Sequence, residues 1–180
     1  MDIKGDDREQ GLRKLRELIE GIPTAALTTL DGDGHLHSRP MATHAMEAEG
    51  VLWFLTKDDS AKVHEVVVNA QVGLTFTAPD PPRYVSVSGR AELVRDRQQV
   101  ERLWRPELKA WFPEGPKGTD LAALRVEIES AQYWDAPSGQ LMSLGGFLRA
   151  LRSGKKAERE PGAESAKVTA KTRIAPDTVT

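Results

Sequence analysis

The chain has 180 residues, of which 39% are hydrophobic and 29% are charged, a composition typical of one globular domain. It contains no cysteine, which excludes disulfides, thiolate catalysis and cysteine-ligated zinc or iron-sulfur centres. The net charge of -2, the acidic and polar first ten residues, and the lack of a long apolar run argue against a nucleic-acid-binding protein, a signal peptide and a membrane span. We therefore expect a cytoplasmic protein with neither a nucleic-acid nor a membrane partner.

The first third of the chain predicts a helix followed by three strands. Leucine and isoleucine recur every three or four residues over 7–20, which is the spacing of one helical face. Residues 24–30 and 35–44 have strand-like composition and flank an Asp-Gly-Asp-Gly turn, which indicates a β-hairpin. Residues 51–56 predict a third strand, which we expect to pair with the second as a meander.

The second strand contains a proline, Pro40, after Arg39. Proline has no amide hydrogen, so a strand that tolerates it should lie at a sheet edge, form a bulge, or bring its backbone close to a ligand. This unusual strand is the first indication of a site.

The rest of the chain predicts two short helices and three more strands. Capping residue types at 58–60 start a helix that runs to about residue 69, and residues 71–77 and 84–94 read as strands. A helical segment at 96–104 and a stretch at 107–112 that two prolines bracket precede a final bent strand at 121–135. Six antiparallel strands in so short a chain favour a small barrel.

The domain boundary is predicted near residue 152. Residues 141–151 suggest one more short helix within a domain of residues 1–152, and the polar composition of 153–180 predicts a disordered tail.

Ser60 and Lys62 stand at the predicted start of a helix, where unpaired backbone N–H groups, a hydroxyl and an ammonium group together favour an anion such as phosphate. Arg39, on a neighbouring strand, adds a planar set of donors. The alternative is purely structural, with Ser60 as a cap and both cations as solvated surface charges. Spacing alone leaves both interpretations open.

Five segments in the same order resemble the general stress protein 26 branch of the pyridoxamine 5'-phosphate oxidase-like, FMN-binding split-barrel superfamily. They are the N-terminal helix and the stretches IPTAALTTLDGDGHLHSRPM, LWFLTKDDSAKVHEVVVNAQVGLTF, YVSVSGRAELVRD and LKAWFPEGP. The resemblance implies a mostly β fold with flanking helices, a six-stranded antiparallel split β-barrel, and a homodimer with FMN in the groove between the two chains.

The resemblance also assigns cofactor-binding positions. It places one strand along the flavin, a second strand end beside the ring or ribityl chain, a phosphate clamp, and an aromatic residue that reaches the partner's flavin. The strand along the flavin corresponds to Arg39, Pro40 and Met41, and the second strand end corresponds to Phe54, Leu55 and Thr56. The phosphate clamp corresponds to Ser60 and Lys62. The aromatic residue corresponds to Trp111, for which Trp104 and Phe112 are close alternatives.

The resemblance leaves the reaction open. The chain lacks the C-terminal arginine and histidine residues of pyridoxamine phosphate oxidases proper, which argues against vitamin B6 oxidation. We predict an FMN-binding flavoprotein, either a flavin- and nicotinamide-linked oxidoreductase or a non-catalytic flavin-binding stress protein, with FAD or F420 as alternative cofactors. No side chain is assigned a catalytic role. His35, His37 and His44 are interpreted as surface or groove residues rather than metal ligands, because a clear acidic third ligand is missing nearby.

Overall fold

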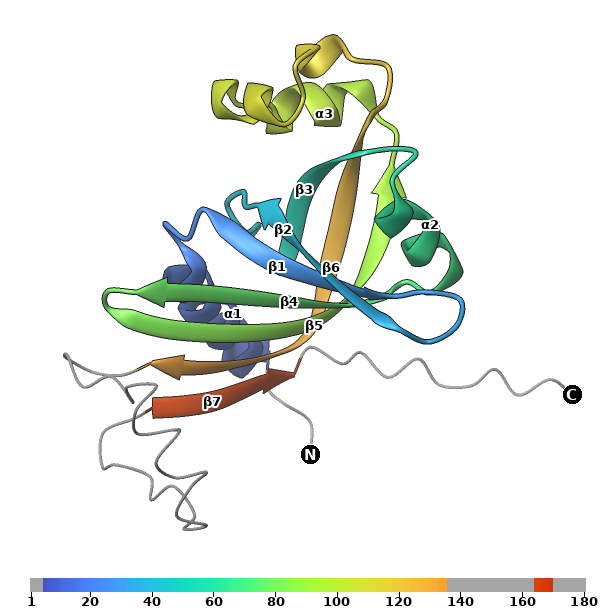
Figure 1. Cartoon of the computed structure of the whole chain (residues 1–180). Helices are drawn as coiled ribbons and strands as arrows, with labels where there is room; N and C mark the ends of the chain where they lie inside the picture. Colours follow the sequence, from blue (N-terminus) through green and yellow to red (C-terminus); the bar gives the residue numbers. More distant parts are fainter. Residues whose placement is uncertain (1–4, 136–163, 170–180) are drawn as a thin grey trace, which may run out of the picture.

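Seven antiparallel strands form the body of the protein in the computed structural model, which describes residues 5–135 and 164–169 (Figure 1). Six of them follow the order β2-β1-β4-β5-β6-β3, and the seventh pairs with β6. Their bounds are β1 Thr24–Leu30, β2 Leu36–Ala42, β3 Val51–Lys57, β4 Gln71–Pro79, β5 Pro82–Val94, β6 Leu121–Asp135 and β7 Glu164–Thr169. The predicted hairpin and the predicted strands are thus present.

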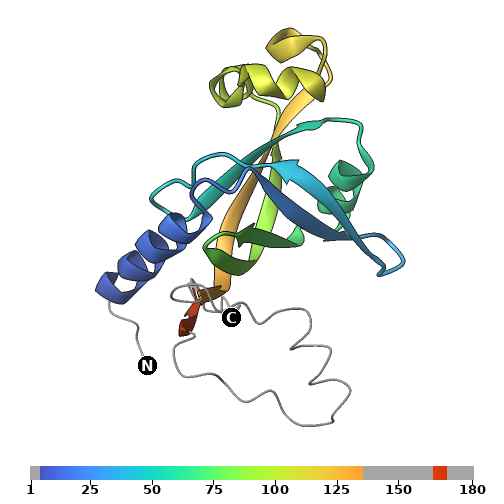
Figure 2. The same ribbon diagram turned by 60° about the vertical axis from the view of Figure 1, so that its left-hand side comes forward.

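The sheet curls around one apolar core, as predicted for a split barrel (Figures 1 and 2). Buried side chains alternate along β1, where Ala25 and Leu27 point inward and Ala26 points outward. The two ends of the strand order, β2 and β3, contact each other, but the six-stranded ladder is not closed by pairing between them in the described part of the chain. The barrel is therefore split at this seam.

Within residues 5–135 and 164–169, three helices and two short 3₁₀ segments cover the sheet. Helix α1, Gly5–Ile19, buries its leucine face against the main core, and α2, Ala61–Val68, lies beside β1 and β5. Helix α3, Arg97–Leu103, and the 3₁₀ segments η1, Pro106–Ala110, and η2, Gly115–Lys117, stand above one end of the barrel (Figure 1). We call these three elements the cap. The cap packs on β3 and β6 through a second apolar cluster.

The predicted pairing of the second and third strands is wrong. Strand β3 pairs with β6 over Val51 to Lys57, and β2 remains an edge strand with β1 as its ladder partner. The physical reason lies in Pro40. A strand between two neighbours donates backbone hydrogen bonds to both of them, and Pro40 has no amide hydrogen to donate. The edge position explains how β2 tolerates its proline.

Strand β6 bends where its register against β5 shifts. Ser88 pairs with Ser130, but Gly89 pairs with Ile128, so the ladder skips Glu129. The first half of β6 then pairs with β3 and the second half with β7. Because of this shift, β6 can pair within the barrel along its first half and with β7 along its second half. This agrees with the bend predicted for the final strand.

The tail prediction differs from the structure at one segment. Residues 164–169 form β7, which pairs with Ser130 to Asp135 of β6, although low apolar content predicted disorder there. A free β6 edge supplies unpaired backbone groups that any non-proline sequence can match. The other predicted tail residues and the short helix expected at 141–151 lie outside the described residues.

We expect Gly89→Ala to destabilise the fold by about 1–3 kcal/mol, because the added methyl group overpacks the β5–β6 contact. A Cβ at position 89 would lie 2.4 Å from the carbonyl oxygen of Glu127, which is backbone and cannot rotate away. Urea unfolding measures the difference. Gly32→Ala is the control, since a Cβ there meets nothing within 4 Å; equal effects of the two substitutions would contradict the close approach.

Candidate functional site

Three polar side chains converge where β3 ends and α2 begins. The ammonium group of Lys62 donates to the hydroxyl oxygens of Thr56, at 3.1 Å, and Ser60, at 3.3 Å. The two hydroxyl oxygens are themselves 3.2 Å apart, and Ser60 also donates to the carbonyl oxygen of Lys57 at 2.8 Å. Ser60 occupies the N-cap position, but its hydroxyl turns toward Lys57 and Lys62. Ser60 and Lys62, the predicted phosphate clamp, thus lie together, and they are joined by Thr56, which was predicted beside the ring or ribityl chain; we call these three residues the hydroxyl–lysine cluster.

The environment of Lys62 is partly dehydrated and positively charged. Burial lowers the pKa of its amine, the positive charge of Arg39 lowers it further, and the carboxylate of Glu65 opposes both. Each effect follows from the cost of placing the charged form in that environment. An anion in this position would relieve the repulsion between the two cations.

Arg39 is held by a network that joins β1, β2 and α2. Its Nη2 donates to Oε2 of Glu65 at 2.8 Å, and its Nη1 donates to the hydroxyl of Thr29. Thr29 is fully buried and donates in turn to the same carboxylate oxygen of Glu65. The side chains of Arg39 and Glu65 are only 20% and 10% exposed, so this ion pair is largely removed from water. The alternative interpretation of Arg39 as a solvated surface charge is therefore wrong.

The hydrogen bond from Thr29, followed by that from Arg39, lowers the pKa of the Glu65 carboxyl against the opposing effect of burial. Glu65 is thus ionised at neutral pH.

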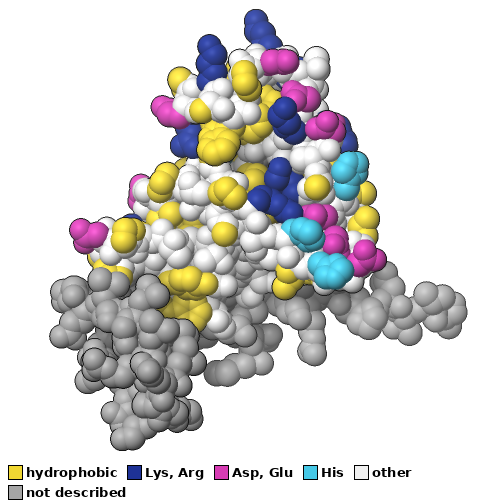
Figure 3. Space-filling view, viewed as in Figure 1, with side chains coloured by type: hydrophobic (Ala, Val, Ile, Leu, Met, Phe, Trp, Pro, Cys, Tyr) yellow, Lys and Arg dark blue, Asp and Glu magenta, His cyan; other side chains and the backbone are white. Residues whose placement is uncertain are grey.

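An open groove of about 510 Å³ lies on the outer side of the sheet beside Arg39. Its wall is small and mostly uncharged, and consists of Ile22, Pro23, Thr24, Ala26, Ser38, Arg39, Pro40, Thr75 and Thr77. On the face shown in Figure 3, histidine, acidic and basic side chains gather on the right, further charged side chains lie at the top and on the left, and apolar side chains are scattered between them. Arg39 belongs both to the groove and to the charged network.

The acidic residues next to the cluster are turned elsewhere. Asp58 accepts two hydrogen bonds from Arg95, at 2.7 and 2.8 Å, and these bonds lower the pKa of its carboxyl. Asp58 and Asp59 line a separate hollow with Thr119 and Asp120. Both aspartates thus border this acidic hollow.

The remaining predicted cofactor residues lie in different surroundings. Met41 and Phe54 are buried in the main core and Leu55 in the cluster beneath the cap, so their side chains serve packing and only their backbone could meet a ligand. Pro40 is exposed on the outer face of β2.

The predicted aromatic residue lies in the cap. Trp111 ends η1 in the cap and is 68% exposed. Its two alternatives, Trp104 and Phe112, pack against the cluster beneath the cap. Of the three, Trp111 is the one free to contact another molecule.

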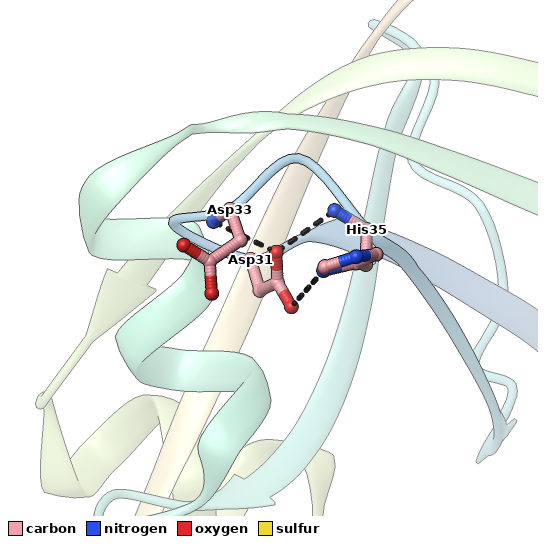
Figure 4. Close-up of side chains that lie close together, drawn as sticks. All are labelled: Asp31, Asp33 and His35. Atoms are coloured by element: carbon pink, nitrogen blue, oxygen red, sulfur yellow. Dashed lines mark hydrogen bonds and ion pairs between the residues drawn. The ribbon is translucent and has the colours of Figure 1, made fainter.

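The histidines of the hairpin are organised by its turn (Figure 4). Oδ2 of Asp31 lies 3.3 Å from Nδ1 of His35 and 3.0 Å from Nε2 of His37, while the backbone N–H groups of Asp33 and His35 donate to Oδ1. The backbone hydrogen bond from His35, the largest effect, lowers the pKa of Asp31 to about 2. Ligand atoms of Asp31, Asp33 and His35 lie within 4.8 Å of one another, and ordinary turn hydrogen bonding accounts for the group.

Thr29 and Glu65 are the functional residues that sequence reasoning missed. Glu65 lies three residues after Lys62 in a predicted helix, which is the spacing of two neighbours on one helical face. That spacing could have indicated the carboxylate, but the contact with β1 and β2 depends on how the helix docks.

Known proteins resemble most of this chain. A family model described as "Pyridoxamine 5'-phosphate oxidase like" matches residues 10–158. Protein bli-3 of Neurospora crassa is 30% identical over 135 residues, which cover 69% of this chain and 65% of that protein. The chain thus spans less than two thirds of the length of this curated relative.

Solved structures share the fold. General stress protein 26 of Bacillus anthracis has a TM-score of 0.61 at 23% identity, covering 69% of this chain and 93% of that one. A structure named as an F420 reductase has a TM-score of 0.51 at 25% identity, covering 64% and 94%. A pyridoxamine 5'-phosphate oxidase-related, FMN-binding protein of Nostoc punctiforme has a TM-score of 0.50 at 15% identity, covering 75% and 85%. Among the described residues, no helix combines the length and the apolar character that a membrane crossing requires.

We expect His44, which follows β2, to make the fold acid-sensitive. Burial and the nearby charge of Arg105 lower its pKa to about 4, and its Nε2 has no hydrogen-bond partner within the described part of the chain. The unfolded chain therefore binds the proton first, and stability falls as the pH drops from about 6.5 to about 4. Because water screens the half-buried ring, the loss should be on the order of 1 kcal/mol. Urea unfolding of His44→Gln at several pH values should show a smaller acid loss, whereas the exposed control His64→Gln should match the native protein.

Proposed function

Because the chain belongs to the pyridoxamine 5'-phosphate oxidase-like family, we propose that it binds FMN non-covalently and acts as a flavin-dependent oxidoreductase of the general stress protein type. The isoalloxazine ring of the bound flavin would supply the electron transfer, and the protein would supply placement and electrostatics. The observation that carries the proposal is the hydroxyl–lysine cluster.

The hydroxyl–lysine cluster fits a phosphate group chemically. A phosphate monoester accepts several hydrogen bonds, and here an ammonium and two hydroxyl groups already lie within hydrogen-bonding distance of one another. The cluster stands at the first turn of α2, where backbone N–H groups also favour an anion. Thr56, Ser60 and Lys62 would hold the phosphate.

The groove beside Arg39 fits the neutral part of a flavin. Its small side chains let a flat ring approach the sheet, and Pro40 on the edge strand leaves the backbone free of a second strand. Arg39 borders the groove along β2, while its guanidinium lies on the opposite face of the strand with Thr29 and Glu65. These residues would orient the ring.

A second copy of the chain would complete this site. Small-molecule sites enclose roughly 70–90% of a ligand surface, and an open groove on one sheet face offers a single wall. We propose that a homodimer supplies the other wall and that Trp111 of each chain reaches the flavin held by its partner. Its 68% exposure in the single chain suits a residue that is buried on association.

A second candidate function is a binding protein that stores or senses a flavin without catalysing a reaction. No side chain of the described site is assigned a catalytic role, which suits this function as well. A purified protein that is yellow but does not oxidise NADH or NADPH would support this binding function over the oxidoreductase function. One structural neighbour is named as an F420 reductase. If the protein quenched the fluorescence of F420 and did not bind FMN, F420 would replace FMN as the proposed cofactor.

We expect Lys62→Ala to weaken FMN binding about 10- to 100-fold, because it removes one charge-assisted hydrogen bond to the phosphate. Riboflavin lacks the phosphate and should lose less than about threefold in affinity on the same estimate. Titration calorimetry with both flavins makes the comparison. Lys117→Ala, on exposed η2, is the matched control. Equal losses for FMN and riboflavin would place the phosphate elsewhere.

We also expect two variants with weakened FMN binding to complement each other. A heterodimer of a Lys62→Ala chain and a Trp111→Ala chain keeps one complete site if Trp111 acts on the partner's flavin. Mixing the two variants after mild unfolding and refolding should therefore restore FMN binding at close to a quarter of all sites, from half of the dimers. Binding that stays at the level of the unmixed variants would show that Trp111 acts within its own chain or not at all. Sedimentation as a monomer would contradict the proposed homodimer.

A further inference from the structure

The two cations of the site differ in how their charge is balanced. The guanidinium of Arg39 forms a largely buried ion pair with Glu65, at 2.8 Å. Lys62 instead donates to the neutral hydroxyl groups of Thr56 and Ser60. Two positive charges and one negative charge therefore leave a net charge of about +1 in the group, and this charge resides on Lys62.

Arg39 retains hydrogen-bonding capacity although its charge is balanced. The bonds to Thr29 and Glu65 use two of its five N–H groups. The carboxylate that balances Arg39 repels a second anion placed on the same guanidinium. A neutral acceptor, such as a ring carbonyl oxygen or nitrogen, meets no such repulsion.

Glu65 is also fixed firmly enough to act on Arg39. Its Oε2 accepts from both Thr29 and Arg39, and Thr29 lies fully buried on β1. The three residues come from β1, β2 and α2, so the orientation of the guanidinium is set by the docking of the helix on the hairpin. His37 is the further titratable group that acts on this carboxylate.

We propose that Glu65 is a positioning residue that divides the flavin site into two parts. By balancing and orienting Arg39, it limits this arginine to neutral acceptors and leaves the phosphate to Lys62. This inference rests on the proposed function for its ligand, but the charge balance on which it depends belongs to the protein alone. It assigns Glu65 and Thr29 a role in selecting between phosphorylated and unphosphorylated flavin.

The first experiment measures the ratio of FMN affinity to riboflavin affinity in the full chain. Glu65→Gln keeps an acceptor for Arg39 but removes the negative charge, so Arg39 becomes available to the phosphate. The ratio should rise about threefold to tenfold, as expected for one unit charge several ångströms away. Glu101→Gln, on the exposed face of α3, should leave the ratio unchanged.

A double variant, Arg39→Gln with Glu65→Gln, separates the two parts of the site. The substitution removes both partners of the ion pair and leaves the net charge of the group at about +1, and removing a whole pair is tolerated better than removing one member. Affinities for FMN and riboflavin should fall by the same factor, so their ratio should stay within about twofold of the native value. A ratio that does not rise in Glu65→Gln, or that falls several-fold in the double variant, would overturn the division of the site.

The second experiment needs no flavin. Lysine side-chain NMR can follow the titration of Lys62 in the unliganded protein, with Lys62→Arg to identify its signal. The Lys62 pKa should fall in Glu65→Gln and rise in Arg39→Gln, because these residues act on it with opposite signs. If the native protein binds neither flavin, the proposed function fails while this titration still decides whether Glu65 sets the charge balance. A Lys62 titration identical in all variants would overturn the inference even if FMN binds.

Discussion

The missing amide hydrogen of Pro40 constrains the arrangement of the whole sheet. A strand with this proline can have one complete ladder, so β2 pairs with β1 and lies at the end of the strand order. The chain then carries β3 across to β6, and the barrel stays open between its two terminal strands. The seam of the split barrel thus follows from a residue that would be unfavourable in a central strand.

The candidate site is built at the rim that this arrangement creates. Arg39, next to Pro40, lines the outer groove and also extends its guanidinium to α2. The end of β3 brings Thr56 to the start of the same helix, where Ser60 and Lys62 complete the cluster. One short helix therefore connects the two halves of the split barrel through polar contacts, while apolar packing holds the rest.

The positive charges of Arg39 and Lys62 are balanced to different degrees. A fully buried threonine and a nearly buried glutamate fix Arg39, whereas Lys62 is bonded to hydroxyl groups that a phosphate could share or replace. This inequality separates a hydrogen-bonding surface for a ring from an uncompensated charge for an anion. Because the chain belongs to the pyridoxamine 5'-phosphate oxidase-like family, we propose a flavin phosphate as the occupant and a partner chain as the second wall of the open groove.

The sequence by itself determined the elements and the local part of the site. Helical spacing located α1, strand-like composition located β1, and alternation located β5. Ser60 and Lys62 are close enough along one turn that their side chains were expected to meet. Tertiary structure alone decided that β3 pairs with β6, that residues 164–169 form a strand, and that Thr29 and Glu65 bind Arg39. Spacing along the chain controls contacts a few residues apart. Contacts between residues 26 or 36 positions apart depend on how whole elements dock, and no local pattern encodes that.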